Sequence, residues 1–148
     1  VVERFIEGPE ITAVAFDDGE RVHVFCAEKV FKETEERKYL FTSFESYNDP
    51  ECYQYILPDP AITEAVTGYT RRAFEVLRCR DYAKFDVRID VATGTPYFTD
   101  ANPNTAFGPS RGLPMTEVLQ MHGIKFSKVL ASLMSKHARR IYAPAQLP

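Results

Sequence analysis

The sequence predicts an α+β domain in which helices pack on one face of an antiparallel β-sheet. Two pairs of segments alternate apolar and polar residues on either side of a turn, which is the pattern of a β-hairpin. Between them lies a long segment whose apolar residues recur every three or four positions, as on one face of a helix. Two further helical patterns close the chain, and this order of elements is typical of an α+β fold.

Length and composition limit the classes of protein. With 148 residues, 45% of them hydrophobic, the chain fits a single domain, 1–148, with a sizeable core. No apolar run approaches the roughly 20 residues of a membrane span, so we expect no membrane contact. A net charge of −3 argues against nucleic-acid binding, which demands a basic surface. The three cysteines are odd in number and lack CxxC spacing, which suits reduced thiols in a cytoplasmic protein.

The N-terminal third predicts a strand, a hairpin and a loop. Val1–Ile6 has the pattern of a strand already begun, so we expect a domain cut from a longer polypeptide. Glu10–Phe16 alternates in the strand period, and Arg21–Cys26 resumes the alternation after a turn rich in aspartate. The mostly charged residues 32–37 predict a loop, and residues 41–47 predict a strand or an ordered loop.

The middle of the chain predicts a helix and the second hairpin. Tyr53–Leu57 is a short extended run, and Pro58-Asp59-Pro60 marks a helix start. The amphipathic segment Ile62–Leu77 follows as that helix. The second hairpin is expected over Ala83–Asn102, with its turn at residues 92–96.

Two helices are expected at the end, after a Gly/Pro-rich loop over residues 103–114. The first spans Pro114–Met121 and is stopped by Gly123. The second spans Ser127–Ile141, with Ser127 as its N-cap.

The second hairpin carries the chemistry. Residues two apart in a strand share a face, so Lys84 and Asp86 point one way. Asp100 and Asn102 share a face on the partner strand. Hard oxygen ligands beside a cation are what a protein uses to hold Mg²⁺ against a polyphosphate. The hairpin therefore indicates a metal and phosphate site.

Two other interpretations of this hairpin stay open. The charged residues could pair across a solvent-exposed sheet face, although Asp and Asn are poor strand formers inside a strand that is otherwise aromatic. Asp86 and Asp100 could also serve as the two carboxyl groups of a glycosidase. The adjacent Asn102 and Lys84 favour metal and phosphate instead. The three histidines have no partner at metal-ligand spacing, and we expect them to be structural or solvated.

Three signatures together resemble a known family. Residues 2–12, Lys84-Phe85-Asp86 and Asp100–Asn104 occur in the order and at the separation found in the C-terminal half of the ATP-grasp fold. Within that fold the sequence is most similar to D-alanine–D-alanine ligases. The likeness continues through Leu113-Pro114 and Gly123–Leu130, and so covers almost the whole chain.

The resemblance implies a role for each matching residue. Backbone groups of an interdomain hinge would bind the adenine edge, Glu10 would accept the ribose hydroxyls, and Thr99 would also contact ATP. The implied hinge residues are Glu3, Arg4, Phe5 and Ile6. The implied ligands of Mg²⁺ (or Mn²⁺) are Asp86, Asp100 and Asn102. Lys84 would be catalytic, where the family carries an Arg that stabilises the phosphate or oxyanion. The residues implied for the second substrate are Ala106, Ser110 and Arg111.

The implied activity is that of an ATP-dependent carboxylate–amine ligase. A carboxylate attacks the γ-phosphate of ATP, and an amine then displaces phosphate from the acyl phosphate. The implied partners are ATP, small carboxylate and amine substrates and a preceding ATP-grasp lobe of the same polypeptide, with a homodimer left open.

The chain departs from the family pattern in three places, and the first two keep an alternative open. Asp100 stands where a Glu is usual, and Ser46 stands where the mobile loop usually carries a Lys. The substrate loop lacks the usual Pro-Gly pair and has Arg111 near the expected Ser. The alternative is a degenerate ATP-grasp module that binds nucleotide for regulation or scaffolding without ligation.

Overall fold

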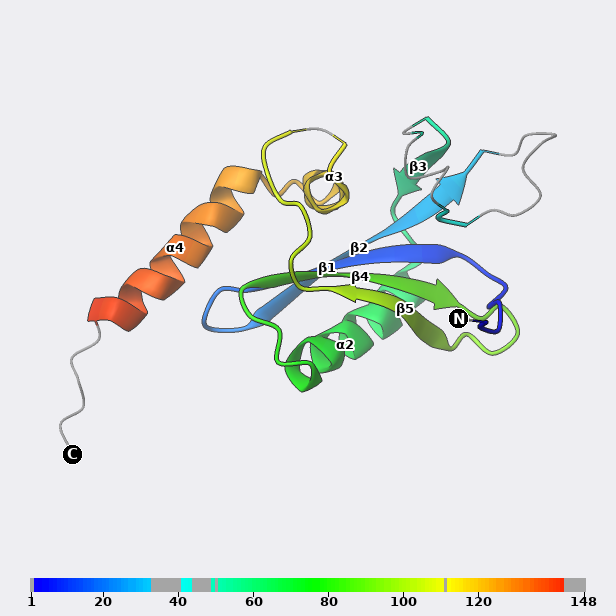
Figure 1. Ribbon diagram of the computed structural model, residues 1–148, viewed down its shortest axis with the longest axis horizontal. Helices are drawn as coiled ribbons and strands as arrows, with labels where there is room; N and C mark the ends of the chain where they lie inside the picture. The colour runs from blue at the N-terminus through cyan, green and yellow to red at the C-terminus, as the bar shows by residue number, and fades with distance from the viewer. Residues whose placement is uncertain (1, 33–40, 44–48, 50, 111, 143–148) are drawn as a thin grey trace.

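A computed structural model describes residues 2–32, 41–43, 49, 51–110 and 112–142. The strands in chain order are β1 (Glu10–Asp17), β2 (Val22–Phe31), β3 (Tyr53–Ile56), β4 (Tyr82–Ile89) and β5 (Pro96–Asn102). The helices are α2 (Pro60–Val76), α3 (Pro114–Met121) and α4 (Phe126–Tyr142). Figure 1 shows their arrangement.

The strands form one five-stranded sheet in the order β3-β2-β1-β4-β5, and every pairing is antiparallel. Both expected hairpins are present, β1 with β2 and β4 with β5. The two hairpins are joined by the pairing of β1 with β4, which puts β1 at the centre of the sheet. The α+β class and the antiparallel sheet are therefore confirmed.

The expected placement of all helices on one face is wrong. In Figure 1, α2 lies on one side of the sheet and α3 lies on the other. The core against α2 contains Ile11, Ala13, Ala15, Phe85, Val66 and Phe74. The core against α3 and α4 contains Val14, Phe16, Met115, Leu119, Val129 and Leu133. Because β1 is buried at both its odd and its even positions, both faces of the sheet are covered there, and each face requires its own helical cover.

The N-terminal segment is not a regular strand, contrary to expectation. It is attached to the extension of β4 by two backbone bonds, from Ile89 N–H to the Pro9 carbonyl at 3.1 Å and from Val91 N–H to the Glu7 carbonyl at 3.0 Å. Gly8 has φ of +149°, and a Cβ there would lie 1.8 Å from the Ile89 carbonyl oxygen. Only glycine allows this close approach. The predicted loop at 32–37 and the predicted strand or loop at 41–47 lie largely outside the described residues.

The helix boundaries are close to those expected. α2 begins at Pro60, where the Asp59 carboxylate accepts the Ala61 N–H at 2.8 Å, and α3 has the predicted bounds. Gly123 follows α3 with φ of +71°. The N-cap expected at Ser127 is wrong, because α4 already begins at Phe126 and Ser127 lies inside its first turn. Within the described residues, none of the helices has the length and apolar character needed to cross a bilayer.

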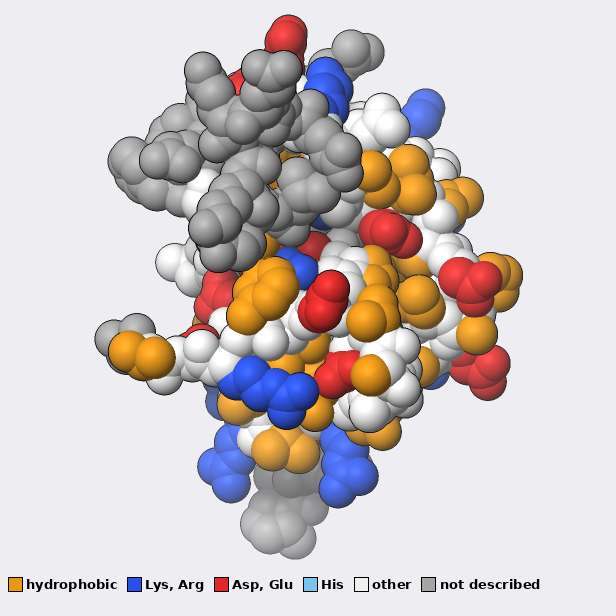
Figure 2. Space-filling view, turned by 90° about the vertical axis from the view of Figure 1, so that its right-hand side faces the viewer, with side chains coloured by type: hydrophobic (Ala, Val, Ile, Leu, Met, Phe, Trp, Pro, Cys, Tyr) orange, Lys and Arg blue, Asp and Glu red, His pale blue; other side chains and the backbone are white. Residues whose placement is uncertain are grey.

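One face of the molecule carries mixed side chains. Figure 2 shows acidic, basic and hydrophobic groups interspersed over the side that lies at the right of Figure 1, where the N-terminal segment and the β4–β5 loop meet. This is the neighbourhood of the predicted hairpin chemistry.

Candidate functional site

The predicted metal and phosphate residues lie opposite one another on β4 and β5. Lys84 pairs with Asn102, and Asp86 pairs with Asp100. All four side chains belong to the sheet face that carries Thr12 on β1, since Thr12 is the partner of Asp86 on the other side of β4. The sequence predicted the shared faces within each strand, and the register across the hairpin brings the two sets together.

A β-bulge aims Asp100 at this face. The pairing of β4 with β5 shifts between Asp86 and Val87, so that Asp100 opposes Asp86 while Phe98 opposes Val87. Phe98 and Asp100 are two residues apart and would share a face in a regular strand. Thr99 is the extra residue of the bulge. Phe98 therefore points to the α2 face, where it packs edge-on against Phe85 with the two ring centres 5.8 Å apart. The Thr99 hydroxyl donates to the Asp86 carbonyl at 3.1 Å and holds the bulge.

The Asp86 carboxylate has two kinds of neighbour. The Lys84 ammonium donates to its Oδ2 and forms an ion pair with it. The Thr12 hydroxyl donates to its Oδ1 at 3.5 Å, and the Tyr55 hydroxyl lies 3.4 Å from the Thr12 oxygen. Burial raises the pKa of Tyr55, so this phenol stays protonated. Each oxygen of the Asp86 carboxylate thus accepts a hydrogen bond, Oδ1 from Thr12 and Oδ2 from Lys84.

The donor set fits a hard divalent cation. Asp86, Asp100 and Asn102 offer carboxylate and amide oxygens on adjacent strands, which are the ligands that Mg²⁺ and Mn²⁺ prefer. The Asn102 Oδ1 accepts the Asn104 N–H at 3.1 Å, which orients the amide. In the described part of the chain no cluster of three His, Cys, Asp or Glu side chains forms a metal site. The third donor here is an amide instead.

A buried ion triad crosses three strands beside these residues. Lys29 on β2, Glu10 on β1 and Arg88 on β4 are direct cross-strand partners. The Lys29 Nζ lies 3.3 Å from Glu10 Oε1, and the Arg88 Nη1 lies 3.2 Å from Glu10 Oε2. All three residues are at most 8% exposed. Burying three charges requires such mutual pairing, because an isolated buried charge is strongly unfavourable.

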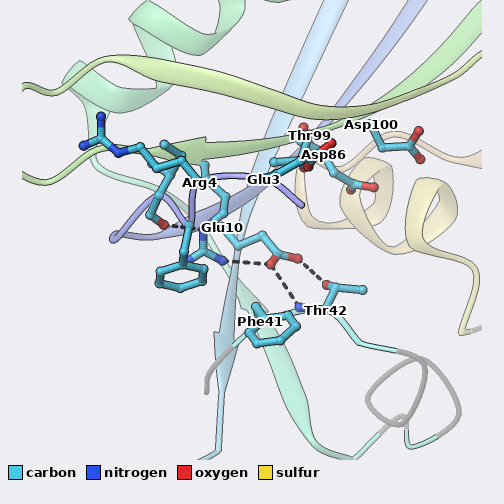
Figure 3. Close-up of a pocket in the computed structure, with 11 residues that line it drawn as sticks. Glu3, Arg4, Glu10, Phe41, Thr42, Asp86, Thr99 and Asp100 are labelled. Atoms are coloured by element: carbon cyan, nitrogen blue, oxygen red, sulfur yellow. Dashed lines mark hydrogen bonds and ion pairs between the residues drawn. The ribbon is translucent and has the colours of Figure 1, made fainter. Parts of the chain in front are cut away.

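Thr42 completes the shell around Glu10. Its hydroxyl donates to Oε1, and its backbone N–H donates to Oε2 at 3.1 Å. The Lys29 ammonium also donates to the Thr42 hydroxyl oxygen at 2.7 Å. Figure 3 shows Thr42 joined to the Glu10 carboxylate by these hydrogen bonds.

Two cavities open on this face. The first has a volume of about 460 Å³. Its lining includes every residue for which the resemblance implies contact with ATP, namely Glu3, Arg4, Phe5, Ile6, Glu10 and Thr99. The second, of about 450 Å³, is lined by Lys84, Asn102, Thr105, Ala106, Tyr53, Tyr55 and Lys29 among others. Asp86, Asp100 and Thr42 line both cavities, so the two adjoin.

The three residues expected at the second substrate are not brought together by the described chain. Ala106 lines the second cavity. Ser110 is exposed in the loop before α3 and is absent from the described lining of either cavity. Arg111, like Ser46, lies outside the described residues. Thr105, which is buried beside Ala106, was not anticipated.

Sequence reasoning also missed Lys29 and Thr42 and gave Arg88 no role. The sequence did hold a signal for Lys29. A four-residue turn after Asp17 places Glu10 opposite Lys29 in the hairpin, and opposite charges at paired positions indicate an ion pair. No local signal marks Thr42, since its partner is 32 residues away.

The histidines have structural partners, as expected. His23 lies 2.6 Å from an Asp18 carboxylate oxygen, and His137 lies 2.7 Å from one of Asp81. The His122 Nε2 lies 2.8 Å from the Cys26 carbonyl oxygen. None of the three lines either of the two cavities.

Known proteins share both sequence and fold with this chain. A D-alanine–D-alanine ligase of Carboxydothermus hydrogenoformans is 26% identical over 137 residues, which make up 90% of this chain and 41% of that protein. Another from Albidiferax ferrireducens is 26% identical over 146 residues, 97% of this chain and 40% of that protein. The chain thus spans about two fifths of the length of these curated relatives.

Solved structures agree in fold. The D-alanine–D-alanine ligase of Bacillus anthracis complexed with ATP has a TM-score of 0.64 and 23% identity, covering 93% of this chain and 40% of that one. The D-alanyl-alanine synthetase A of Vibrio cholerae has a TM-score of 0.66 and 17% identity, covering 90% and 40%. Residues 1–135 match the family described as D-ala D-ala ligase C-terminus. The resemblance predicted from the sequence is therefore confirmed, and the chain belongs to this family, the C-terminal region of the ATP-grasp ligases.

Proposed function

We propose that this chain supplies the nucleotide- and metal-binding half of the active site of an ATP-dependent carboxylate–amine ligase. The observation that carries the proposal is the pair of adjoining cavities on one sheet face, one lined by residues 3–6 and Glu10 and the other by Lys84, Asp86 and Asn102. An elongated ligand such as ATP would extend from one cavity toward the other and needs different chemistry at its two ends. The family match supports the same conclusion.

The first cavity is proposed to hold the nucleoside. Backbone groups of Glu3–Ile6 would bind the base, and Phe5 offers an exposed aromatic ring. Glu10 would accept the ribose hydroxyls, and Thr99 would contact the nucleotide from the bulge of β5. A carboxylate has about four acceptor positions. Lys29, Arg88 and Thr42 occupy those of Glu10, so ribose binding requires one of these donors to yield.

Asp86, Asp100 and Asn102 are proposed to hold Mg²⁺ or Mn²⁺ at the boundary of the two cavities. When bound, the metal would neutralise phosphate charge as a Lewis acid. Lys84 already pairs with Asp86, so its ammonium stands beside the proposed phosphate position. There it would stabilise the charge that develops on the transferred phosphoryl group and on the later oxyanion. Lys presents a point charge where an Arg would present a planar fork.

The second cavity is proposed to receive the small carboxylate and amine substrates. Ala106 forms part of its wall, and Ser110 and Arg111 would receive the carboxylate of the second substrate from the loop that follows. Thr105, the neighbour of Ala106 in the sequence, is buried and lines the same cavity. The similar proteins are named for D-alanine, and the proposal here extends only to small carboxylates and amines. The remaining part of the site would come from the preceding lobe of the polypeptide.

A second candidate is a nucleotide-binding module without ligation. Two observations favour it. Asp100 has one methylene less than Glu, and it is exposed at the edge strand of the sheet. The Glu10 carboxylate is also saturated by donors of this chain.

The polypeptide that contains this chain distinguishes the two candidates. For a ligase, we expect phosphate release from ATP that requires Mg²⁺ and that small amino acids stimulate, and the Asp86→Asn variant should lack it. Binding of ATP without turnover in any amino-acid mixture would support the module. Absence of adenine-nucleotide binding in a folded protein would contradict both.

A further inference from the structure

Arg88 makes two hydrogen bonds in addition to the one that pairs it with Glu10 in the ion triad. Its Nη1 donates to Glu10, its Nε donates to the Ile6 carbonyl at 2.7 Å, and its Nη2 donates to the Gly8 carbonyl at 2.8 Å. Three of the five N–H donors of the guanidinium therefore point at three different acceptors. The Arg88 Cζ also lies 4.7 Å from the centre of the Phe5 ring. Only 7% of the residue is exposed.

Successive backbone carbonyls of the N-terminal segment accept hydrogen bonds alternately from the Arg88 side chain and from the backbone of β4 and its extension. The carbonyls of Glu7 and Pro9 accept backbone N–H groups at and just beyond the end of β4. The carbonyls of Ile6 and Gly8, which alternate with them, accept the Arg88 side chain. One set of bonds attaches the segment to the C-terminal end of β4, and the other attaches it to the Arg88 side chain, which lines the first cavity.

The segment that Arg88 holds is the wall of that cavity. Glu3, Arg4, Phe5 and Ile6 line the space together with Glu10 and Arg88. Arg88 is the side chain that touches both Phe5–Gly8 on one side and the Glu10 carboxylate on the other. It fixes the distance between the proposed base-binding backbone and the proposed ribose-binding carboxylate.

We propose that Arg88 is a positioning residue for the nucleoside end of the site. It sets nucleotide affinity by presenting the 3–6 wall and Glu10 in one arrangement, without acting on the reacting atoms. The inference rests on the proposed function and deepens it. The rigid fork of arginine is essential to the role, because the compact ammonium of a lysine cannot serve three acceptors in divergent directions.

The test uses the polypeptide that contains this chain and four substitutions, the last of which, Arg88→Ala, serves for chemical rescue. Arg88→Met keeps most of the carbon stem and removes the guanidinium. Arg88→Lys keeps a cation beside Glu10 and loses the fork. Arg71→Met is the matched control, since Arg71 donates through Nε to the Val22 carbonyl at 3.1 Å but is exposed on α2. Affinity for ATP and ADP is measured by calorimetry, and KM and kcat are measured for any turnover.

We expect Arg88→Met to weaken nucleotide binding and raise the KM for ATP about 10- to 100-fold, because a misplacement of about 1 Å can cost about 100-fold. The kcat at saturating ATP should change less than about threefold, as expected when binding is lost equally in the ground state and the transition state. Arg88→Lys should fail to restore affinity, and Arg71→Met should bind normally. In Arg88→Ala, millimolar guanidinium should restore part of the affinity where ammonium does not.

Four results would overturn the inference: unchanged affinity in Arg88→Met, full affinity in Arg88→Lys, an equal loss in Arg71→Met, or a fall in kcat as large as the rise in KM. If Arg88→Met does not fold, Arg88→Lys carries the test, since it keeps the charge balance of the triad. Failure of the proposed function is recognised separately. In that case the unaltered protein itself binds no adenine nucleotide.

Discussion

Thr42 donates a hydrogen bond to each oxygen of the Glu10 carboxylate, one from its hydroxyl and one from its backbone N–H. A ribose presents two neighbouring hydroxyl donors in the same manner. Lys29 and Arg88 fill the remaining acceptor positions of Glu10. If Glu10 accepts the ribose hydroxyls as proposed, Thr42 and a bound ribose would compete for one carboxylate, and the Thr42 contact would oppose nucleotide binding.

Replacing Thr42 by Val removes the hydroxyl donor and keeps the size of the side chain. We expect ATP to bind about 2- to 10-fold more tightly, the range that corresponds to the net free energy of one hydrogen bond. For 2′,3′-dideoxy-ATP, which brings no hydroxyl to Glu10, the affinity should be the same in both proteins. Calorimetry with the two nucleotides and the two proteins gives the full comparison.

Thr42→Ser serves as the control for that comparison, because it keeps both donors and should bind like the unaltered protein. Weaker ATP binding in Thr42→Val would mean that Thr42 supports the nucleotide instead of competing with it. Equal tightening for both nucleotides would also contradict the competition.

The metal assignment predicts a loss that depends on Mg²⁺. Asp86→Ala and Asn102→Ala each remove one proposed oxygen ligand, so Mg²⁺-dependent nucleotide binding should fall at least about 10-fold. Nucleotide binding in the presence of EDTA should change much less. Asp59→Ala, which removes only the N-cap of α2, should leave the Mg²⁺ dependence intact. Normal Mg²⁺-dependent binding in either ligand variant would refute the assignment.

Asp100→Glu tests whether the site is built around the shorter acid. The side chain is exposed on the edge strand, so an extra methylene meets little steric resistance. We expect Mg²⁺-dependent turnover to stay the same or rise. A large loss at an unchanged melting temperature would show that the metal position depends on the shorter side chain.

Asp81 predicts a stability change with pH. Partial burial alone would raise the pKa of Asp81, but hydrogen bonds from Lys136 and His137 outweigh it and lower the pKa below the ordinary value of 3.8. The stabilisation is therefore present above that value and is lost as the pH falls through the lower pKa of the folded state. Asp81→Asn should lower the melting temperature by about 2–5 °C at pH 7.

The effect of the same substitution should shrink as the pH falls below 3.8 and should vanish in acid strong enough to protonate Asp81 in the folded state. Asn is the suitable replacement, because residue 81 has φ of +65° and Asn tolerates this conformation better than most residues. A difference in melting temperature that persists unchanged into strong acid would exclude the ion pairs as its cause.

The elements of this fold could be read from local patterns. The alternation over Glu10–Phe16, the spacing of apolar residues over Ile62–Leu77 and the glycine at 123 each reflect a nearby physical requirement. The pairs Lys84 with Asp86 and Asp100 with Asn102 follow from the two-residue period of a strand. The sequence by itself determined these elements and the oxygen-rich character of the hairpin.

Long-range packing decided the rest. Only the paired strands reveal that the bulge at Thr99 turns Asp100 toward Asp86 while Phe98 packs on the opposite face. The two helical covers, α2 on one face and α3 with α4 on the other, form only in the assembled sheet, where β1 lies at the centre between two cores. Glu10 is saturated because donors 19, 32 and 78 residues away meet at one carboxylate. Burial makes those pairings obligatory, and burial is a property of the assembled sheet, not of any segment of sequence.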